Sequence, residues 1–363
     1  MTRHNAKAAL IVLMLLLLVS PARAAETAKP DWGILAFPAL EGYNLVEFYL
    51  HWQSDAKAAL EETASLGTTR ALIAKPWQEL EPTSGKLKLD DLRAEVVQRR
   101  ELKQDIFWGL QVINTVKREV PEDLQKTAWD DPVMVARATA IMDATLALLP
   151  TDSMSYVAFG NEVDVYFTRH PEELPAFLAL YRHVGTAIKA KYPQVRLGIA
   201  STFDSVREKR GALVETLNRD TDVVILTYYA IQGLKVLPPE APHRELPMMV
   251  ALAAGKPVVL QEVGYPSAAG VGSSEAQQAE FIRQFFAAWE KHRAAIPTIS
   301  LFMQTDFGSR LCAQFTEYYG MGDYKTQFAD FICTLGLKDA HGRPKLAWSV
   351  LQNEVAPRLR SAR

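Results

Sequence analysis

The sequence is short of the residues that metal and nucleotide sites require. It has two cysteines and seven histidines among 363 residues. The histidines show no HxH, HExxH or Cys/His spacing, so we expect no metal site. The first predicted strand is followed by PALEGYN rather than by a glycine-rich GxGxxG turn, which argues against an open nucleotide-binding sheet. We therefore expect no cofactor.

The chain also has no large excess of positive or negative charge. The chain carries 40 Lys and Arg against 42 Asp and Glu, a formal net charge of −2. Nucleic acids and anionic membrane surfaces are bound by strongly basic surfaces. We expect neither of these as a partner.

Long hydrophobic runs are absent except at the N-terminus. Arg3 and Lys7 precede an apolar stretch at 8–19, and a small-x-small triplet follows it. This order predicts a signal peptide at 1–24 that is cleaved, since the run is too short to span a bilayer. The alternative is a membrane anchor left in place. We expect a secreted or periplasmic monomer without a membrane span in its mature chain, 25–363.

The two cysteines, Cys312 and Cys333, both lie near the C-terminus. In an oxidising compartment a disulfide between them is plausible. The alternative is a pair of unpaired buried thiols.

Short apolar runs alternate with amphipathic stretches along the whole chain. Helices are predicted at 55–66, 130–149, 174–192 and 274–292. Runs that are apolar on both faces and separated by crossover helices are typical of a parallel sheet. Eight such units predict an α/β fold, a single (β/α)₈ TIM barrel, over residues 25–363. The strands are predicted at 32–37, 70–74, 105–113, 155–161, 195–201, 222–228, 257–261 and 298–303.

Two of these apolar runs, YVAFGNE and VVLQEVGYP, contain a glutamate where the strand ends. The active site of such a barrel lies where strands end and βα loops begin. We therefore expect Glu162 and Glu262 at one mouth. Strand alternation places Glu162 on the inner face and Asn161 on the opposite face. For one glutamate alone, capping of the next helix is the common alternative.

Paired carboxylates that flank a cavity are the groups that cleave glycosidic bonds. One of them protonates the departing oxygen, and the other attacks or activates water, so their pKa values must differ. We assign Glu162 as general acid/base and Glu262 as nucleophile. Direct attack requires the carboxyl groups to be ~5–5.5 Å apart, whereas inversion requires ~6.5–9.5 Å.

Neighbouring residues fit this division of roles. The amide of Asn161 is suited to bind a sugar hydroxyl. Tyr228 or Tyr229, at the end of the sixth strand, is placed to donate a hydrogen bond to Glu262. Arg70, on the second strand, is a further candidate to stabilise that charge.

The segments around both glutamates resemble those of clan A glycoside hydrolases, and are nearest in their motifs to the 1,3-β-glucanase branch. FGNEVD at 159–164 and VVLQEVGYPSAAG at 258–270 carry the resemblance. PWQELEPTSGKLKLDDL at 76–92 and GLKDAHGRPKLAWSVL at 336–351 are similar to further segments of the clan. The resemblance implies a retaining (β/α)₈ enzyme with its acid/base after strand four and its nucleophile after strand seven.

The residues that would bind sugar are less regular. Aromatic rings stack on the apolar face of a pyranose, and Trp77 and Tyr265 fall just after strand ends, although Tyr265 is equally suited to brace its loop. Many clan A enzymes have a tryptophan near the end of strand eight. This chain has Met303, Gln304 and Phe307 there, and we take Gln304 as a substrate contact.

The leading hypothesis is a retaining glycoside hydrolase that cleaves β-glycosidic bonds in a polysaccharide or oligosaccharide. The alternative is a catalytically inactive carbohydrate-binding barrel that acts in polysaccharide export or envelope assembly. Retention of both glutamates argues against the alternative, because binding alone does not require the pair. A metal-dependent barrel hydrolase would need histidines at strand ends, and only His51 comes near one.

Overall fold

The structure is a computed structural model, and it describes residues 30–39, 41, 56–150 and 154–360. The predicted signal peptide at 1–24 and the last three residues lie outside the described residues. His51 does so as well.

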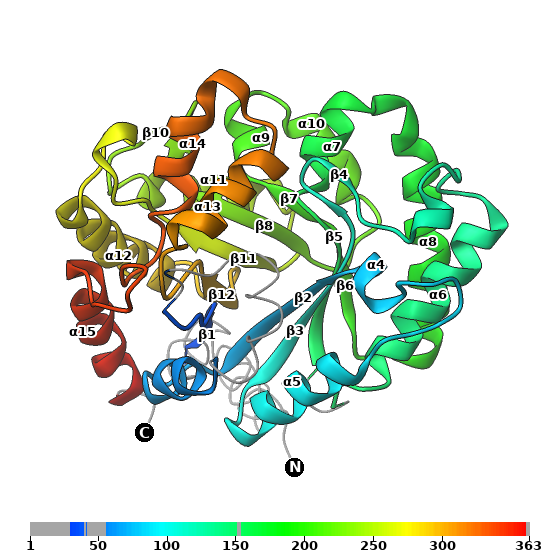
Figure 1. The fold of residues 1–363 in the computed structure, drawn as a ribbon, viewed down its shortest axis with the longest axis horizontal. Coiled ribbons are helices and arrows are strands. Elements are labelled where there is room, and N and C mark those ends of the chain that lie inside the picture. The colour runs from blue at the N-terminus through cyan, green and yellow to red at the C-terminus, as the bar shows by residue number, and fades with distance from the viewer. Residues whose placement is uncertain (1–29, 40, 42–55, 151–153, 361–363) are drawn as a thin grey trace, which may run out of the picture.

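Parallel strands occupy the centre of the molecule, and helices surround them (Figure 1). The strands are β1 (Asp31–Ile34), β2 (Arg70–Pro76), β3 (Asp105–Asn114), β4 (Lys117–Arg118), β5 (Met154–Asn161), β6 (Arg196–Gly198), β7 (Ala200–Thr202), β8 (Val224–Tyr229), β9 (Ile231–Gln232), β10 (Lys235–Val236), β11 (Val258–Gly264) and β12 (Thr298–Leu301). One sheet has the order β1-β12-β11-β8-β7, and another has the order β2-β3-β5-β6 with β4 paired antiparallel to β3. A small third sheet pairs β9 with β10.

The two large sheets approach each other at both edges. Ile199 alone separates β6 from β7, which belong to different sheets. At the other edge, the backbone amide of Thr69 donates to the carbonyl of Trp32 at 2.9 Å, but no ladder joins β1 to β2 among the described residues. The eight predicted strand segments each overlap a strand. The ladders show an α/β fold with parallel sheets, and they do not close the predicted eight-stranded ring.

Helices cover the outer faces of the sheets. In Figure 1, α6 and α8 lie beside β5 and β6, whereas α11, α12 and α15 lie on the other side of the molecule. The four predicted helices correspond to the helix at 56–65, α6, α8 and α12. Within the described ranges, no helix is both long and apolar enough to cross a bilayer. The α-helices are α4 (Trp77–Leu80), α5 (Asp90–Glu101), α6 (Pro132–Leu146), α7 (Val163–Arg169), α8 (Leu174–Lys191), α9 (Asp204–Arg207), α10 (Gly211–Leu217), α11 (Pro242–Leu252), α12 (Glu275–Glu290), α13 (Ser309–Tyr318), α14 (Lys325–Ile332) and α15 (Leu346–Arg360).

Strand β5 shows how the two faces of a sheet are used. Val157 and Phe159 point outward into a buried cluster with Phe177 of α8. Ala158 points inward and lies in a cluster with Phe107. Because both faces are buried, the strand is apolar at almost every position.

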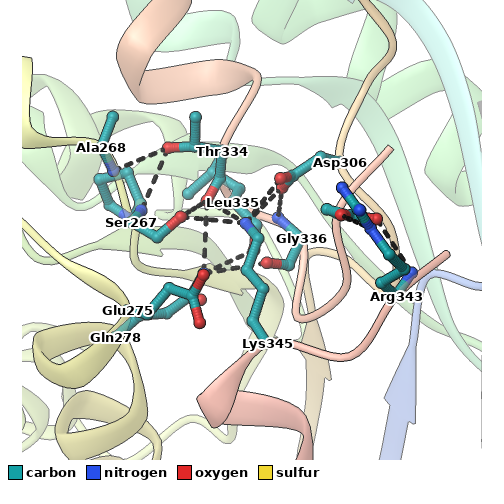
Figure 2. A network of polar contacts seen from close by, with 12 residues as sticks. Ser267, Ala268, Glu275, Gln278, Asp306, Thr334, Leu335, Gly336, Arg343 and Lys345 are labelled. Atoms are coloured by element: carbon teal, nitrogen blue, oxygen red, sulfur yellow. Dashed lines mark hydrogen bonds and ion pairs between the residues drawn. The ribbon is translucent and has the colours of Figure 1, made fainter. Parts of the chain in front are cut away.

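A buried polar network holds the C-terminal helix against the sheet (Figure 2). The Nζ atom of Lys345 donates to Asp306 Oδ1 at 2.8 Å and to Ser267 Oγ at 3.0 Å. The side-chain amide of Gln278, on α12, donates to the carbonyl of Gly336 at 3.1 Å. Lys345 directly precedes α15, so the network ties this helix to the loops after β11 and β12.

The two cysteines form a disulfide. Cys312 lies in α13 and Cys333 directly follows α14, with their Cα atoms 5.7 Å apart. The bond closes the helical excursion that follows β12.

Candidate active site

Both glutamates lie toward the carboxyl ends of parallel strands. Glu162 directly follows β5 and precedes α7, and Glu262 lies within β11 opposite Thr227 of β8. Each side chain is partly exposed. The residues immediately before them are joined, because the amide of Gln261 donates to Asn161 Oδ1 at 2.6 Å. The two strands are therefore linked directly beside the two carboxylates.

The backbone before Glu162 leaves the regular strand conformation. Gly160 has a φ of +87°, and a Cβ there would lie 2.4 Å from a methyl group of Val163, so glycine is required. This break also ends the strand alternation. The side chain of Asn161 turns toward the mouth, where its Nδ2 donates to Asn114 Oδ1 at 2.9 Å. The prediction that Asn161 faces the helices is wrong for this reason.

Two threonine hydroxyls hold the carboxylate of Glu162. Thr227 donates to Oε1 at 2.6 Å, and Thr115, which follows β3, donates to Oε2 at 2.8 Å. Thr115 and Glu162 have φ values of +49° and +48°. Left-handed backbone costs about 1–3 kcal/mol for such residues and is found mainly at functional sites.

Tyr229 is the tyrosine that contacts Glu262. Its hydroxyl donates to Glu262 Oε2 at 2.6 Å. Tyr228 points the other way, into the core beneath the helices, and donates to Glu245 Oε2 at 2.8 Å. The structure thus decides between the two alternatives in favour of Tyr229.

The two carboxylates differ in proton affinity. Burial and the negative charge of Glu262 raise the pKa of Glu162 to about 8. Burial also raises the pKa of Glu262, but hydrogen bonds from Tyr229 and Gln261 oppose this shift. These effects favour the proton of the pair on Glu162 and the charge on Glu262. This is the division that acid-assisted attack requires.

Arg70 lies at the opposite end of the strands. It is the first residue of β2, and its Nε donates to Asp31 Oδ2 at 2.8 Å, while Asp105 lies 3.7 Å from its Nη2. All three residues begin a strand. The prediction that Arg70 stabilises Glu262 is wrong, because the amino ends of parallel strands lie away from the carboxylates.

The predicted aromatic sugar contacts, Trp77 and Tyr265, are buried. Trp77 has no exposed surface and donates from its indole nitrogen to Glu81 at 2.8 Å. Tyr265 stacks on Phe281 and donates to the carbonyl of Leu237 at 2.7 Å. A ring without an open face cannot stack on a pyranose, so these two predictions are wrong. Tyr265 braces its loop, as the alternative expected.

Gln304 is also buried, with 1% of its surface exposed. Its side-chain amide donates to Glu62 at 2.7 Å, and the amide is therefore not directed at Glu162 or Glu262. The predicted substrate contact is wrong. The partly exposed aromatic residue after β12 is Phe302, whose ring meets Tyr229 edge-on with the centroids 6.1 Å apart. Met303 and Phe307 are buried.

The sequence interpretation missed Thr115, Thr227, Gln261 and Phe302. All four lie at or next to the end of a predicted strand. A search for every polar or aromatic side chain at those ends, rather than for acids alone, would have selected them.

A cluster that could hold a metal ion occurs at the far end of α7. Atoms of His170, Glu172 and Glu173 lie within 4.8 Å of one another. One Glu173 oxygen already accepts hydrogen bonds from Trp129 at 2.7 Å and Tyr166 at 2.9 Å. The cluster is separated from Glu162 by the whole helix.

No protein-family model matches the chain, and no curated protein matches it. Solved structures do. GH5_18 from Streptomyces cattleya in complex with GlcNAc is 18% identical with a TM-score of 0.69, over 92% of this chain and 81% of that one. A variant of the same enzyme in complex with Manβ1-4GlcNAc is 19% identical with a TM-score of 0.68, over 91% and 81%. The exo-β-1,4-mannosidase Op5Man5 from Opitutaceae bacterium strain TAV5 is 21% identical with a TM-score of 0.69, over 92% of this chain and 60% of that chain.

The structural neighbours are thus GH5 glycoside hydrolases, and the chain shares their α/β fold with parallel strands. An α/β fold with parallel strands is what the sequence resemblance implies. The structure adds two carboxylates of unequal proton affinity, in a shared hydrogen-bond network toward the carboxyl ends of the strands.

Proposed function

We propose that the protein is a retaining β-glycosidase with Glu162 as general acid/base and Glu262 as nucleophile. One observation carries the proposal: two glutamates from different strands lie on either side of the Asn161–Gln261 hydrogen bond, where burial and the charge of Glu262 raise the pKa of Glu162 to about 8. Such a pair holds one proton and one negative charge at neutral pH.

In the first step a Glu262 oxygen attacks the anomeric carbon while Glu162 gives its proton to the departing glycosidic oxygen. The carbon–oxygen bond to the leaving group breaks, and an ester bond between the sugar and Glu262 forms. Tyr229 keeps Glu262 ionised until attack.

In the second step Glu162, now ionised, takes a proton from water. The resulting hydroxide-like oxygen attacks the anomeric carbon and releases Glu262. Thr115 and Thr227 stabilise the charge that Glu162 carries between the two steps. The product keeps the configuration of the substrate.

The proposed substrate is a β-mannoside. Support comes from two structural neighbours, one described as an exo-β-1,4-mannosidase and one in complex with Manβ1-4GlcNAc. A β-1,3-glucan is the second candidate, favoured by the VVLQEVGYPSAAG segment around Glu262. In the described residues nothing favours the inactive carbohydrate-binding barrel.

The proposal also covers the closure of the barrel, the location of the enzyme and its oligomeric state. The two sheets would form one eight-stranded barrel over residues 25–363, since their edges meet at Thr69 and at Ile199. Residues 1–24 would direct export to the periplasm or the exterior, and the mature enzyme would act as a monomer.

The test is an assay of the mature chain on aryl β-mannosides and aryl β-glucosides, with a panel of mannans, β-glucans and exopolysaccharides scored for new reducing ends. We expect turnover of a β-mannoside and a first product in the β configuration by NMR. The variants Glu262→Ala and Glu162→Gln should lower kcat/KM by about 10³-fold or more.

The matched control is Glu215→Gln, a change at an exposed glutamate of α10 that should leave turnover unchanged. Near wild-type activity in Glu262→Ala would remove the nucleophile assignment. A first product in the α configuration would show inversion. If no polymer gains reducing ends and no aryl glycoside is hydrolysed, the result would favour the inactive carbohydrate-binding barrel.

A further inference from the structure

The helices after β12 connect the two large sheets. We call residues 309–333, which comprise α13, α14 and the disulfide, the bridging segment (in orange in Figure 1). The segment follows a strand of the sheet that contains β11. Its Tyr318 contacts the other sheet, because the hydroxyl donates to Glu119 Oε1 at 2.6 Å and lies 3.4 Å from the carbonyl oxygen of Asn114, the last residue of β3.

Glu119 holds three loops together. It directly follows β4 and is 3% exposed. The side-chain amide of Gln78, in α4 after β2, donates to Glu119 Oε2, and the backbone amide of Gln78 donates to the carbonyl of Glu119 at 2.9 Å. The Nζ atom of Lys117 lies 3.8 Å from Glu119 Oε1 and 4.0 Å from the centre of the Tyr318 ring. A buried carboxylate costs free energy unless it is paired in this way. The loops after β2, β3 and β12 are therefore fixed to one charge.

The order of the strands shows which side of the mouth the bridging segment spans. From β12 to β3 the order runs through β1 and β2, whose edges meet at the Thr69–Trp32 hydrogen bond. Glu162 follows β5, the neighbour of β3, and Glu262 lies in β11, the neighbour of β12. The segment thus spans the side of the mouth formed by β12, β1, β2 and β3. The strands β6, β7 and β8 form the other side.

The bridging segment also lies against the groups that hold both carboxylates. Tyr318 approaches the residue that precedes Thr115, and Thr115 donates to Glu162. The ring of Phe331, on α14, meets the ring of Tyr229 edge-on, with centroids 5.3 Å apart, and the Tyr229 hydroxyl donates to the other carboxylate. A sugar held between the two carboxylates would therefore have the segment directly beside it.

We propose that the bridging segment closes one end of the sugar site, so that the enzyme removes single sugars from the non-reducing end of a β-linked chain. Glu119 and Tyr318 determine this specificity, because their contact holds the segment across the mouth. The inference rests on the proposed function and deepens it. The terminal sugar, which becomes bound to Glu262, would lie against the segment, and the rest of the chain would extend over β6, β7 and β8.

The test uses β-1,4-mannopentaose and β-1,3-glucopentaose, each reduced to an alditol at its reducing end so that mass spectrometry identifies the cleaved bond. We expect the first products from one of them to be a single sugar and the alditol shortened by that sugar. Disaccharides or larger sugars among the first products would overturn the inference and leave the glycosidase proposal standing.

Tyr318→Phe removes the hydroxyl that contacts Glu119 and keeps the ring. The ratio of internal to terminal cleavage should rise roughly tenfold or more, since a hydrogen bond to a charged group biases the closed arrangement by about that factor. The matched control is Tyr324→Phe, an exposed tyrosine between α13 and α14, which should leave the ratio unchanged. A folded Tyr318→Phe with the wild-type ratio would refute the role of this contact. If Tyr318→Phe does not fold, Gln78→Leu, which removes another hydrogen bond to Glu119, takes its place.

Binding separates this inference from the proposed function. For a protein that cleaves no glycoside, isothermal titration calorimetry compares each reduced pentasaccharide with a copy that carries a benzyl ether on the hydroxyl where its chain would be extended. Binding of the free chain and rejection of the capped one would support the closed end, although the glycosidase would be refuted. Equal affinity for both, or no binding of either, would overturn the inference as well.

Discussion

Glu162 and Glu262 have the same side chain, and their neighbours make them chemically different. Glu162 receives hydrogen bonds from two threonines, but burial and the charge of Glu262 raise its pKa to about 8. Glu262 receives the phenolic hydrogen of Tyr229. The assignment of roles therefore depends on three hydroxyl groups as much as on the two acids.

Tyr229→Phe should impair the nucleophile. Without the phenolic donor the pKa of Glu262 rises, because the hydrogen bond opposes the effect of burial. Since Glu262 must be ionised to attack, the acid limb of the kcat/KM profile should move to higher pH. A hydrogen bond to a charged group is worth about 1.5–3 kcal/mol, so kcat/KM should fall roughly 10- to 100-fold.

The adjacent tyrosine provides the control for this experiment. Tyr228→Phe removes a hydroxyl that contacts Glu245 in the core. It should lower stability and leave the pH profile in place. Equal effects of both variants on the acid limb would contradict the placement of Glu262 beside Tyr229.

The tyrosine pair also shows the limit of sequence reasoning at this scale. Alternation requires Tyr228 and Tyr229 to point to opposite faces of the sheet. The sequence does not show which of the two lies on the same face as Glu262, because the register between β8 and β11 is unknown from sequence. The ladder between them shifts register between Leu260 and Glu262. Such an irregularity reverses the faces of the residues that follow it. Only the paired structure decides which tyrosine meets Glu262.

At the scale of elements, the disulfide should determine whether residues 309–333, whose Phe331 contacts Tyr229, stay in place. Cys312 and Cys333 are 21 residues apart, and a loop of that size is stabilised by about 3 kcal/mol when it is closed. The double variant Cys312→Ser/Cys333→Ser should therefore unfold at lower denaturant concentration and lose activity with it. Unfolding curves and kcat/KM, each with and without a reductant, measure both effects.

The reductant is the internal control. It should lower the stability of the wild type to that of the double variant and leave the double variant unchanged. A wild type whose activity is insensitive to full reduction, verified by thiol titration, would contradict a dependence of the site on residues 309–333.

The sequence predicted the positions of helices and strands better than the surroundings of individual side chains. Apolar runs and amphipathic periods located the eight strand segments and four of the helices, since those patterns follow from burial. Trp77 and Tyr265 were misplaced because the short helix α4 after β2 and the loop after β11 pack into the core, where a large ring is more stable than in water.

At the scale of the molecule, Lys345 links the C-terminal helix to the loops near the site. Burial raises the pKa of Asp306 to about 7, even with the Lys345 ammonium beside it. Lys345→Met should raise this pKa further. At pH 8 Asp306 is mostly ionised in the wild type, so the variant loses an ion pair there, at a cost of about 3–5 kcal/mol. At pH 5.5 Asp306 is mostly protonated in the fold, so the cost should be smaller.

Urea unfolding at the two pH values measures this difference. The control is Arg343→Met, which breaks an ion pair with Asp339 whose arginine side chain is 75% exposed. That change should cost about 0–1 kcal/mol. A loss in Lys345→Met that is equal at pH 5.5 and pH 8 would show that Asp306 does not titrate in this range.

The division of the strands into two sheets has a consequence for the chemistry. Glu162 follows a strand of one sheet, and Glu262 belongs to the other. In the proposed mechanism, the distance between the two carboxylates therefore depends on how the two sheets pack against each other. The Asn161–Gln261 hydrogen bond joins the sheets directly beside that gap. Neither sheet alone would supply both of the carboxylates that the proposed reaction needs.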